Sequence, residues 1–333
     1  NASNLLIYGE NSVGKSSKYR AIQEFFSVDS QGKPFSSFKN IFSDAASMDG
    51  VVALHFEGAG AGDQKIEWKI SGDRPSKNPN VASTAIRVAC VDYRDLLRTN
   101  FVHQGEVVNL FDLAVNHLLR HHPVSVKGTS VNTVGGLWRR VLQSKPPTHH
   151  QRRLQVCEAA VEDFNQAFTS LVPTLAAKAE ELLADFPGGK FDLSLTFPKV
   201  RYDKDLRAFS GCQLELEVGL NGRALASHHH VLNEARLSSI ALAIYFAGLL
   251  ISIPPPPPGA PVYPSVLVLD DVLIGLDMSN RMPILDLLRR HFADWQIFLF
   301  TYDKVWHEIV RLQTQDDPSW CYHELYVGAA PGG

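Results

Sequence analysis

The chain has 333 residues, of which 45% are hydrophobic and 20% charged, a composition typical of a globular protein. The formal net charge is −3, so bulk charge does not drive the chain onto nucleic acid, although a local basic patch remains compatible with DNA binding. The four cysteines are scattered without a CxxC pair, which excludes a zinc ribbon or a disulfide framework. We find no signal peptide and no apolar run of about 20 residues, and therefore expect a cytoplasmic protein without membrane contact.

Short apolar runs alternate with helical patterns along the chain. Strands are predicted at 5–8, 51–57, 65–70, 85–91, 191–197, 212–220, 266–269 and 296–300. Helices are predicted at 18–26, 110–120, 233–250 and 279–291, and between 137 and 185 with breaks at Pro146–Pro147 and Pro173. This alternation predicts an α/β fold with a helical insertion. We assign 1–120 to an N-terminal lobe, 121–190 to the insertion and 191–333 to a C-terminal lobe.

A phosphate-binding motif follows the first predicted strand, and a predicted helix follows the motif. It fits G-x-x-x-x-G-K-[ST] and consists of Gly9, Glu10, Asn11, Ser12, Val13, Gly14, Lys15 and Ser16, with Ser17 next to it. Its backbone N–H groups form an anion nest, and the helix dipole adds to the attraction for phosphate. We expect Lys15 to contact the β- and γ-phosphates and Ser16 to bind Mg²⁺. A Gly-rich turn formed by chance is the alternative, and the flanking strand and helix argue against it. Because so few residues precede this strand, we expect that upstream strands are missing from the sequence.

An acidic pair ends the most apolar predicted strand. Asp270 and Asp271 follow Val266–Leu269 directly, in the form of a Walker B strand. Asp270 is predicted to hold Mg²⁺ opposite the phosphate loop, and Asp271 to polarise the attacking water. The alternative is a strand end that only caps the next turn.

Three further segments resemble motifs of ABC-type ATPases. Residues 274–281 (IGLDMSNR) resemble the D-loop, which implies that Asp277 lies beside the nucleotide at a dimer interface. Residues 232–238 (LNEARLS) resemble the signature segment, usually LSGGQ. This resemblance implies contacts with the γ-phosphate of the opposite subunit from Asn233, Glu234, Ala235 and Arg236. Tyr302 follows the last predicted strand and stands at the switch position.

The order of these motifs is similar to that of the ABC/SMC/RecF group of ATPases. The resemblance implies a P-loop NTPase of the ABC-ATPase type that uses ATP and Mg²⁺. It further implies a homodimer or higher homo-oligomer formed through the nucleotide sites. Gln104 is a candidate for the Q-loop and hence a metal contact, with a polar turn as the alternative.

Several positions depart from the group's pattern. The two signature glycines are replaced by Glu234 and Ala235, the usual glutamate after the metal ligand by Asp271, and the switch histidine by Tyr302. Asp271 is one methylene shorter than glutamate, and tyrosine does not titrate near neutral pH, so we expect slow hydrolysis.

Within the group, the short insertion and the sequence LNEARLS at 232–238 resemble those of ATPase subunits of anti-phage systems such as Septu or PARIS. That resemblance implies a switch or sensor acting on an effector, such as a nuclease partner. A RecF-like DNA-repair ATPase and a nucleotide-binding scaffold with little turnover remain alternatives. We interpret the histidine runs at 121–122, 149–150 and 228–230 as solvated loop residues, and the pairs Arg139–Arg140 and Arg152–Arg153 as a solvated helix face.

Overall fold

The computed structural model describes residues 3–27, 34–38, 50–57, 63–100, 108–126, 133–146, 151–187, 189–226, 228–253, 262–273 and 275–326. The chain divides into two compact units. Unit 1 contains Asn1–Asp92, Pro255–Val272 and Phe292–Gly333, and unit 2 contains Tyr93–Pro254 and Leu273–His291. Unit 2 extends well beyond 121–190 in both directions, and the three-part division from the sequence stays a prediction.

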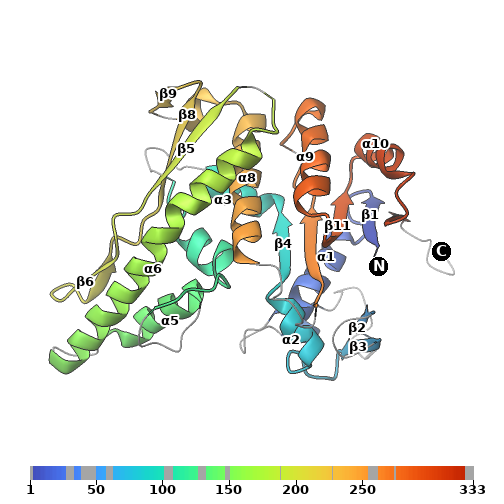
Figure 1. Ribbon diagram of the computed structural model, residues 1–333. Helices are drawn as coiled ribbons and strands as arrows, with labels where there is room; N and C mark the ends of the chain where they lie inside the picture. The colour runs from blue at the N-terminus through green and yellow to red at the C-terminus, as the bar shows by residue number, and fades with distance from the viewer. Residues whose placement is uncertain are drawn as a thin grey trace. The chain divides into compact units, whose positions relative to one another are not determined.

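Unit 1 is built on a parallel sheet with the strand order β12-β1-β11-β10-β4, so the predicted α/β class is confirmed (Figure 1). Its elements are β1 (Asn4–Gly9), α1 (Lys15–Phe25), η1 (Phe35–Phe38), β2 (Val51–Phe56), β3 (Gln64–Lys69), α2 (Pro79–Ala85), β4 (Val88–Asp92), β10 (Ser265–Asp270), β11 (Trp295–Thr301), α10 (Lys304–Thr314) and β12 (Trp320–Leu325). Strands β2 and β3 form a separate antiparallel hairpin.

The central strands of this sheet are buried on both faces, which explains their continuous apolar sequences. All six residues of β10 are buried, and Val268 and Leu269 are fully inaccessible. The predicted strand at 85–91 in fact begins at Val88, because residues 79–85 form α2, whose N-cap Asn78 accepts hydrogen bonds from two backbone N–H groups. The parallel register carries the carboxyl ends of β1, β10 and β11 to one edge of the sheet, where the site lies.

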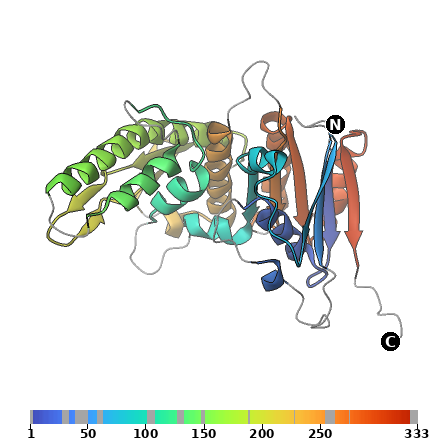
Figure 2. The same cartoon turned by 90° about the horizontal axis from the view of Figure 1, so that it is seen from below.

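Unit 2 combines helices with a small antiparallel sheet in the order β5-β8-β9. Its elements are α3 (Tyr93–Asn100), α4 (Phe111–Leu113), the π-helical turn η2 (Ala114–Leu118), α5 (Val134–Ser144), α6 (Gln151–Leu183), β5 (Phe191–Thr196), β6 (Arg201–Asp203), β7 (Ala208–Ser210), β8 (Glu215–Leu220), β9 (Arg223–Leu225), α7 (His228–Val231), α8 (Glu234–Ser252) and α9 (Met278–His291). Helix α5 lies along α6 in both views (Figure 1, Figure 2).

Helix α6 runs without a break through Pro173, so the predicted interruption at this residue is wrong. Proline removes one backbone hydrogen bond from a helix, which normally ends or kinks it. Here Phe168, Val172 and Leu175 are buried around the proline, and this packing offsets the lost bond. Phe111 packs edge-on against Phe168, which joins α4 to the same core.

Helix α8 is apolar on all faces and is buried accordingly, with every residue from Ser239 to Leu249 buried. Within the part of the chain that the structure describes, it is the one helix long and apolar enough to cross a membrane, and 72% of its most apolar stretch is buried inside the protein. Burial against α6 and η2 explains this composition.

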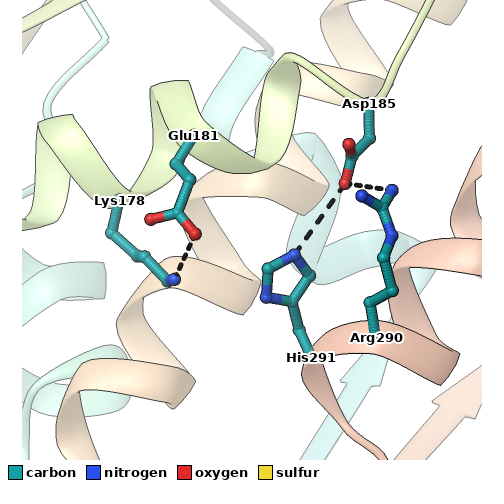
Figure 3. Close-up of polar contacts among 5 residues, drawn as sticks. All are labelled: Lys178, Glu181, Asp185, Arg290 and His291. Carbon is teal, nitrogen blue, oxygen red and sulfur yellow. Dashed lines mark hydrogen bonds and ion pairs between the residues drawn. The ribbon is translucent and has the colours of Figure 1, made fainter.

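A charged contact joins the residues just after α6 to the last turn of α9 (Figure 3). Asp185 Oδ2 lies 2.7 Å from Arg290 Nη2 and 3.9 Å from His291 Nε2. One turn earlier, Lys178 and Glu181 form a separate ion pair. The Arg290 side chain is 57% exposed, so its pair contributes only about 0.2–1 kcal/mol to stability.

Candidate functional site

The loop between β1 and α1 has the backbone conformation of an anion nest. Ser12 (φ 74°) and Gly14 (φ 95°) both adopt left-handed conformations, which turn successive N–H groups toward one side. Helix α1 then begins at Lys15, and the N–H groups of its first turn have no partner within the helix. A Cβ on Gly9 would lie 2.5 Å from Val13 Cγ2, so a glycine is needed where the loop folds back on the strand. The loop can therefore present N–H groups and a helix dipole to phosphate.

The Lys15 side chain is folded into this loop. It is only 4% exposed, and its Nζ donates to the carbonyl oxygens of Gly9 at 2.6 Å and Glu10 at 3.1 Å. Burial raises the pKa of both Asp270 and Asp271, and the charge of Lys15 opposes this rise, which places the ammonium near the end of β10. A buried ammonium with two neutral acceptors is poised to exchange them for phosphate oxygens, because hydrogen bonds between two charged groups are stronger.

Asp270 ends β10 and faces the phosphate loop. It is 6% exposed, and burial raises the pKa of its carboxyl, while a hydrogen bond with Ser16 and the charge of Lys15 oppose the rise. Its Oδ1 has no hydrogen-bond partner among the residues that the structure describes. A buried, unsatisfied carboxylate oxygen next to a serine hydroxyl fits the oxygen ligands of Mg²⁺, so the residues present fit the ATP–Mg²⁺ that the sequence implies.

Asp271 lies at the start of the turn after β10 and is held in a left-handed conformation, with φ of 53°. Its N–H donates to the Phe300 carbonyl at 3.2 Å, and its Oδ1 accepts from the Tyr302 N–H at 3.0 Å. Burial raises the pKa of Asp271 to about 6, with Lys15 opposing the rise. The Tyr302 ring lies 5.9 Å from Lys15 Nζ, so all three predicted catalytic residues meet in unit 1.

Asp92 is a site residue that sequence reasoning missed. Strand β4 pairs in parallel with β10, and Asp92 stands directly opposite Asp270. Burial is the main cause of the raised pKa of Asp270, and the charge of Asp92 adds to the rise, so the two carboxylates lie close together. The sequence did contain a signal, because Asp92 directly follows the predicted strand at 85–91. The carboxyl ends of parallel strands meet at one edge of the sheet, so an acidic residue there can lie near Asp270.

The residues that resemble the signature and the D-loop lie in unit 2. Asn233 is the N-cap of α8, and its Oδ1 accepts from the Arg236 N–H at 3.1 Å, while Glu234 and Ala235 form the first turn. Asp277 accepts hydrogen bonds from Ser279 and Asn280 and so caps α9. These contacts lower the pKa of Asp277.

Close packing also connects the two segments within unit 2. A Cβ on Gly275 would lie 2.6 Å from Ser238 Oγ and 3.4 Å from Glu234 Oε1, so the D-loop-like turn lies against the first turns of α8. Arg281 Nε donates to the carbonyls of Leu273 and Leu276, which closes this turn. Gln104 lies outside the described residues. The roles assigned to these residues stay predictions.

Comparisons with known proteins give fold similarity at low sequence identity. No protein family model matches the sequence, and no curated protein matches it. The Smc head domain with an extended coiled coil bound to the C-terminal domain of ScpA, from Pyrococcus furiosus, has a TM-score of 0.49 at 15% identity, covering 91% of this chain and 84% of that one. An Smc head bound to the C-winged helix domain of ScpA has a TM-score of 0.48 at 17% identity, covering 92% and 84%. The recombination mediator protein RecF with ATP, of the RecFOR pathway, has a TM-score of 0.45 at 13% identity. The match covers 91% of this chain and 87% of that one. The functional argument therefore rests on this chain's own loop and carboxylates.

Proposed function

We propose that this chain binds ATP–Mg²⁺ at its phosphate loop and hydrolyses it, as an ATPase of the ABC/SMC type. The observation that carries the proposal is the burial of Lys15 within a left-handed loop, next to two carboxylates at the end of β10. Lys15 Nζ donates to two backbone carbonyls, which phosphate oxygens can replace with stronger, charge-assisted hydrogen bonds.

Each residue of the site has a role in this reaction. The loop N–H groups and Lys15 bind the β- and γ-phosphates, and Ser16 and Asp270 hold the magnesium ion. Mg²⁺, when bound, neutralises charge on the phosphates. Asp271 accepts a hydrogen bond from the attacking water and orients it, and Tyr302 donates a hydrogen bond at the switch position.

The proposed active form is a homodimer or a higher homo-oligomer. In it, residues 233–236 and Asp277 of one subunit contact the triphosphate that is bound by the phosphate loop of another. ATP would then act as the ligand that shifts the population toward the closed dimer. Support comes from the sequence resemblance and from the close packing of Gly275 on the first turns of α8.

A finer proposal assigns the ATP-driven change to the control of an effector, such as a nuclease in anti-phage defence. Only the sequence LNEARLS at 232–238 and the short insertion support this assignment. The alternative is a RecF-like ATPase that binds duplex DNA, for which the exposed Arg139, Arg152 and Arg153 are candidate phosphate contacts. Arg140 is less suited to this role, because it pairs with Asp163 at 2.7 Å.

A third candidate is a nucleotide-binding scaffold with slow turnover. Asp271 and Tyr302 favour it, since the carboxylate is short and is already engaged by the Tyr302 N–H. Measurable ATP affinity without phosphate release would select this candidate over the ATPase.

Gel filtration with and without ATP–Mg²⁺, together with a phosphate-release assay, tests the proposal. We expect an ATP-dependent increase in mass and slow phosphate release. Lys15→Ala should weaken ATP binding about 100-fold or more, because charge-assisted hydrogen bonds contribute about 1.5–3 kcal/mol each. Lys18→Ala is the matched control, because Lys18 is an exposed lysine on the same helix. Equal ATP affinity in the two variants would refute the phosphate-loop assignment.

Two further measurements separate the biological roles. Salt-dependent binding of duplex DNA that appears only with ATP supports the repair candidate. Copurification of a nuclease encoded by a neighbouring gene supports the effector-control candidate.

A further inference from the structure

A second cluster of candidate metal ligands lies in unit 1, on elements that the proposed nucleotide chemistry does not use. His307 and Glu308 come from α10 and Glu324 from β12. One ligand atom from each of these side chains lies within 4.8 Å of the other two. Residues 16, 270 and 271, which we assign to the magnesium ion and the attacking water, are not part of this cluster.

His307 is the unusual member of the cluster. It is 1% exposed, and neither ring nitrogen has a hydrogen-bond partner among the described residues. Its Nδ1 lies 3.7 Å from Glu308 Oε1, which is too long for a hydrogen bond. Leaving a buried polar group unsatisfied costs about 1–3 kcal/mol, so an imidazole in this position calls for a ligand.

The two carboxylates are oriented by neighbouring groups. Arg311 Nη2 lies 2.7 Å from Glu308 Oε2, so its pairing leaves Oε1 directed to His307. The Tyr326 hydroxyl donates to Glu324 Oε2. Partners of this kind fix the direction of metal-binding carboxylates in known sites.

We propose that His307, Glu308 and Glu324 bind a transition-metal dication of the Zn²⁺ type, separate from the Mg²⁺ that accompanies ATP. One imidazole with two carboxylates suits Zn²⁺ or its first-row neighbours, whereas Mg²⁺ prefers oxygen ligands alone. Bonds of about 2.05 Å in a tetrahedral site place the ligand atoms roughly 3.3 Å apart. Glu308 is 41% exposed, so its side chain has room to move inward by the remaining distance.

The position of this cluster indicates a structural role for the ion. Glu324 stands opposite Tyr8 in the parallel pairing of β12 with β1, and the His307 ring packs on the Tyr8 ring with centroids 5.4 Å apart. Tyr8 directly precedes Gly9, the first residue of the phosphate loop. An ion bound here would join α10 to β12 across the end of β1 and stabilise the strand from which the loop starts.

Isothermal titration of Zn²⁺ into the chelator-treated, nucleotide-free chain tests this proposal, with Mg²⁺ in large excess. We expect one tight site in the wild type that is at least about 10-fold weaker in His307→Gln and in Glu324→Gln. His323→Gln is the matched control, because His323 is exposed and precedes Glu324 on the same strand. The chain has 13 histidines, so the site is defined by the difference between variants.

A second readout keeps the test independent of the buried histidine. Zn²⁺ should raise the melting temperature of the wild type and of His323→Gln, and at the same concentration should raise that of Glu324→Gln by less. Glu324 is exposed, and its replacement by glutamine preserves the fold. Equal Zn²⁺ affinity in the wild type and Glu324→Gln, absence of tight binding in the wild type, or equal competition by Mg²⁺ would overturn the proposal.

Discussion

The left-handed conformation of Gly14 allows a sharp test of the phosphate loop. Gly14 has a φ of 95°, and a Cβ placed on it would meet nothing within 4 Å. The cost of Gly14→Ala is therefore conformational alone, at about 1–2 kcal/mol for an L-residue in this region. In Gly14→Ala, the phosphate loop relaxes by turning its N–H groups away from the phosphate site. ATP binding must then restore the original conformation of the loop. Since 1.4 kcal/mol corresponds to a factor of ten, we expect the Kd for ATP to rise about 5- to 30-fold.

Gly222 supplies the matched control. It lies in the turn between β8 and β9 with a φ of 74°, and its Cβ would also meet nothing within 4 Å. Gly222→Ala should lower stability by a similar amount and leave the Kd for ATP unchanged. The assay is titration of a fluorescent ATP analogue, with thermal unfolding measured in parallel. A Kd for Gly14→Ala within twofold of that for Gly222→Ala would refute the anion-nest reasoning.

Three further predictions concern the strand end, the start of α8 and the contact after α6. Asp271→Asn should retain ATP binding and lose phosphate release, trapping an ATP-bound dimer visible by gel filtration; normal turnover would remove Asp271 from its role. Asn233→Ala should cost about 1 kcal/mol in thermal unfolding through loss of the cap on the Arg236 N–H, whereas Asn233→Ser should stay near the wild type. Asp185→Asn should lower stability by less than about 1 kcal/mol, and the loss should shrink at high salt because the Arg290 partner is exposed; an undiminished loss in salt would show that packing, not charge, is involved.

The sequence predicts the site best where its signals are local. The phosphate loop follows an apolar strand directly, and Asp270 follows another, so parallel pairing brings them together once the strands are recognised. Helix α10 and strand β12 were not predicted. Strand β12 has only Trp320 buried, and its pairing partner β1 lies more than 300 residues away, so no periodic pattern marks it. Asp92 was missed because the sequence does not show that its strand pairs with β10, which places Asp92 opposite Asp270.

Packing accounts for the uninterrupted course of α6 through Pro173. Pro173 signals a helix end by its own chemistry, and the buried aromatic and aliphatic side chains around it determine the outcome instead. The partners that bury these side chains, such as Phe111 against Phe168, are distant in sequence, and a single sequence does not specify them. The helices predicted at 233–250 and 279–291 begin in the signature-like and D-loop-like segments, while the packing of Gly275 on Ser238 depends on tertiary structure.

The pairing of β1 has a consequence for the order in which the protein assembles. Strand β1 lies between β11 and β12, so both of its neighbours are synthesised only after unit 2. Most of unit 2, by contrast, is one continuous stretch that can fold during synthesis. Strand β1 is thus among the last of these elements to reach its native pairing, because contacts between distant residues form slowly. Nucleotide binding would accordingly be acquired only after β11 and β12 have been synthesised.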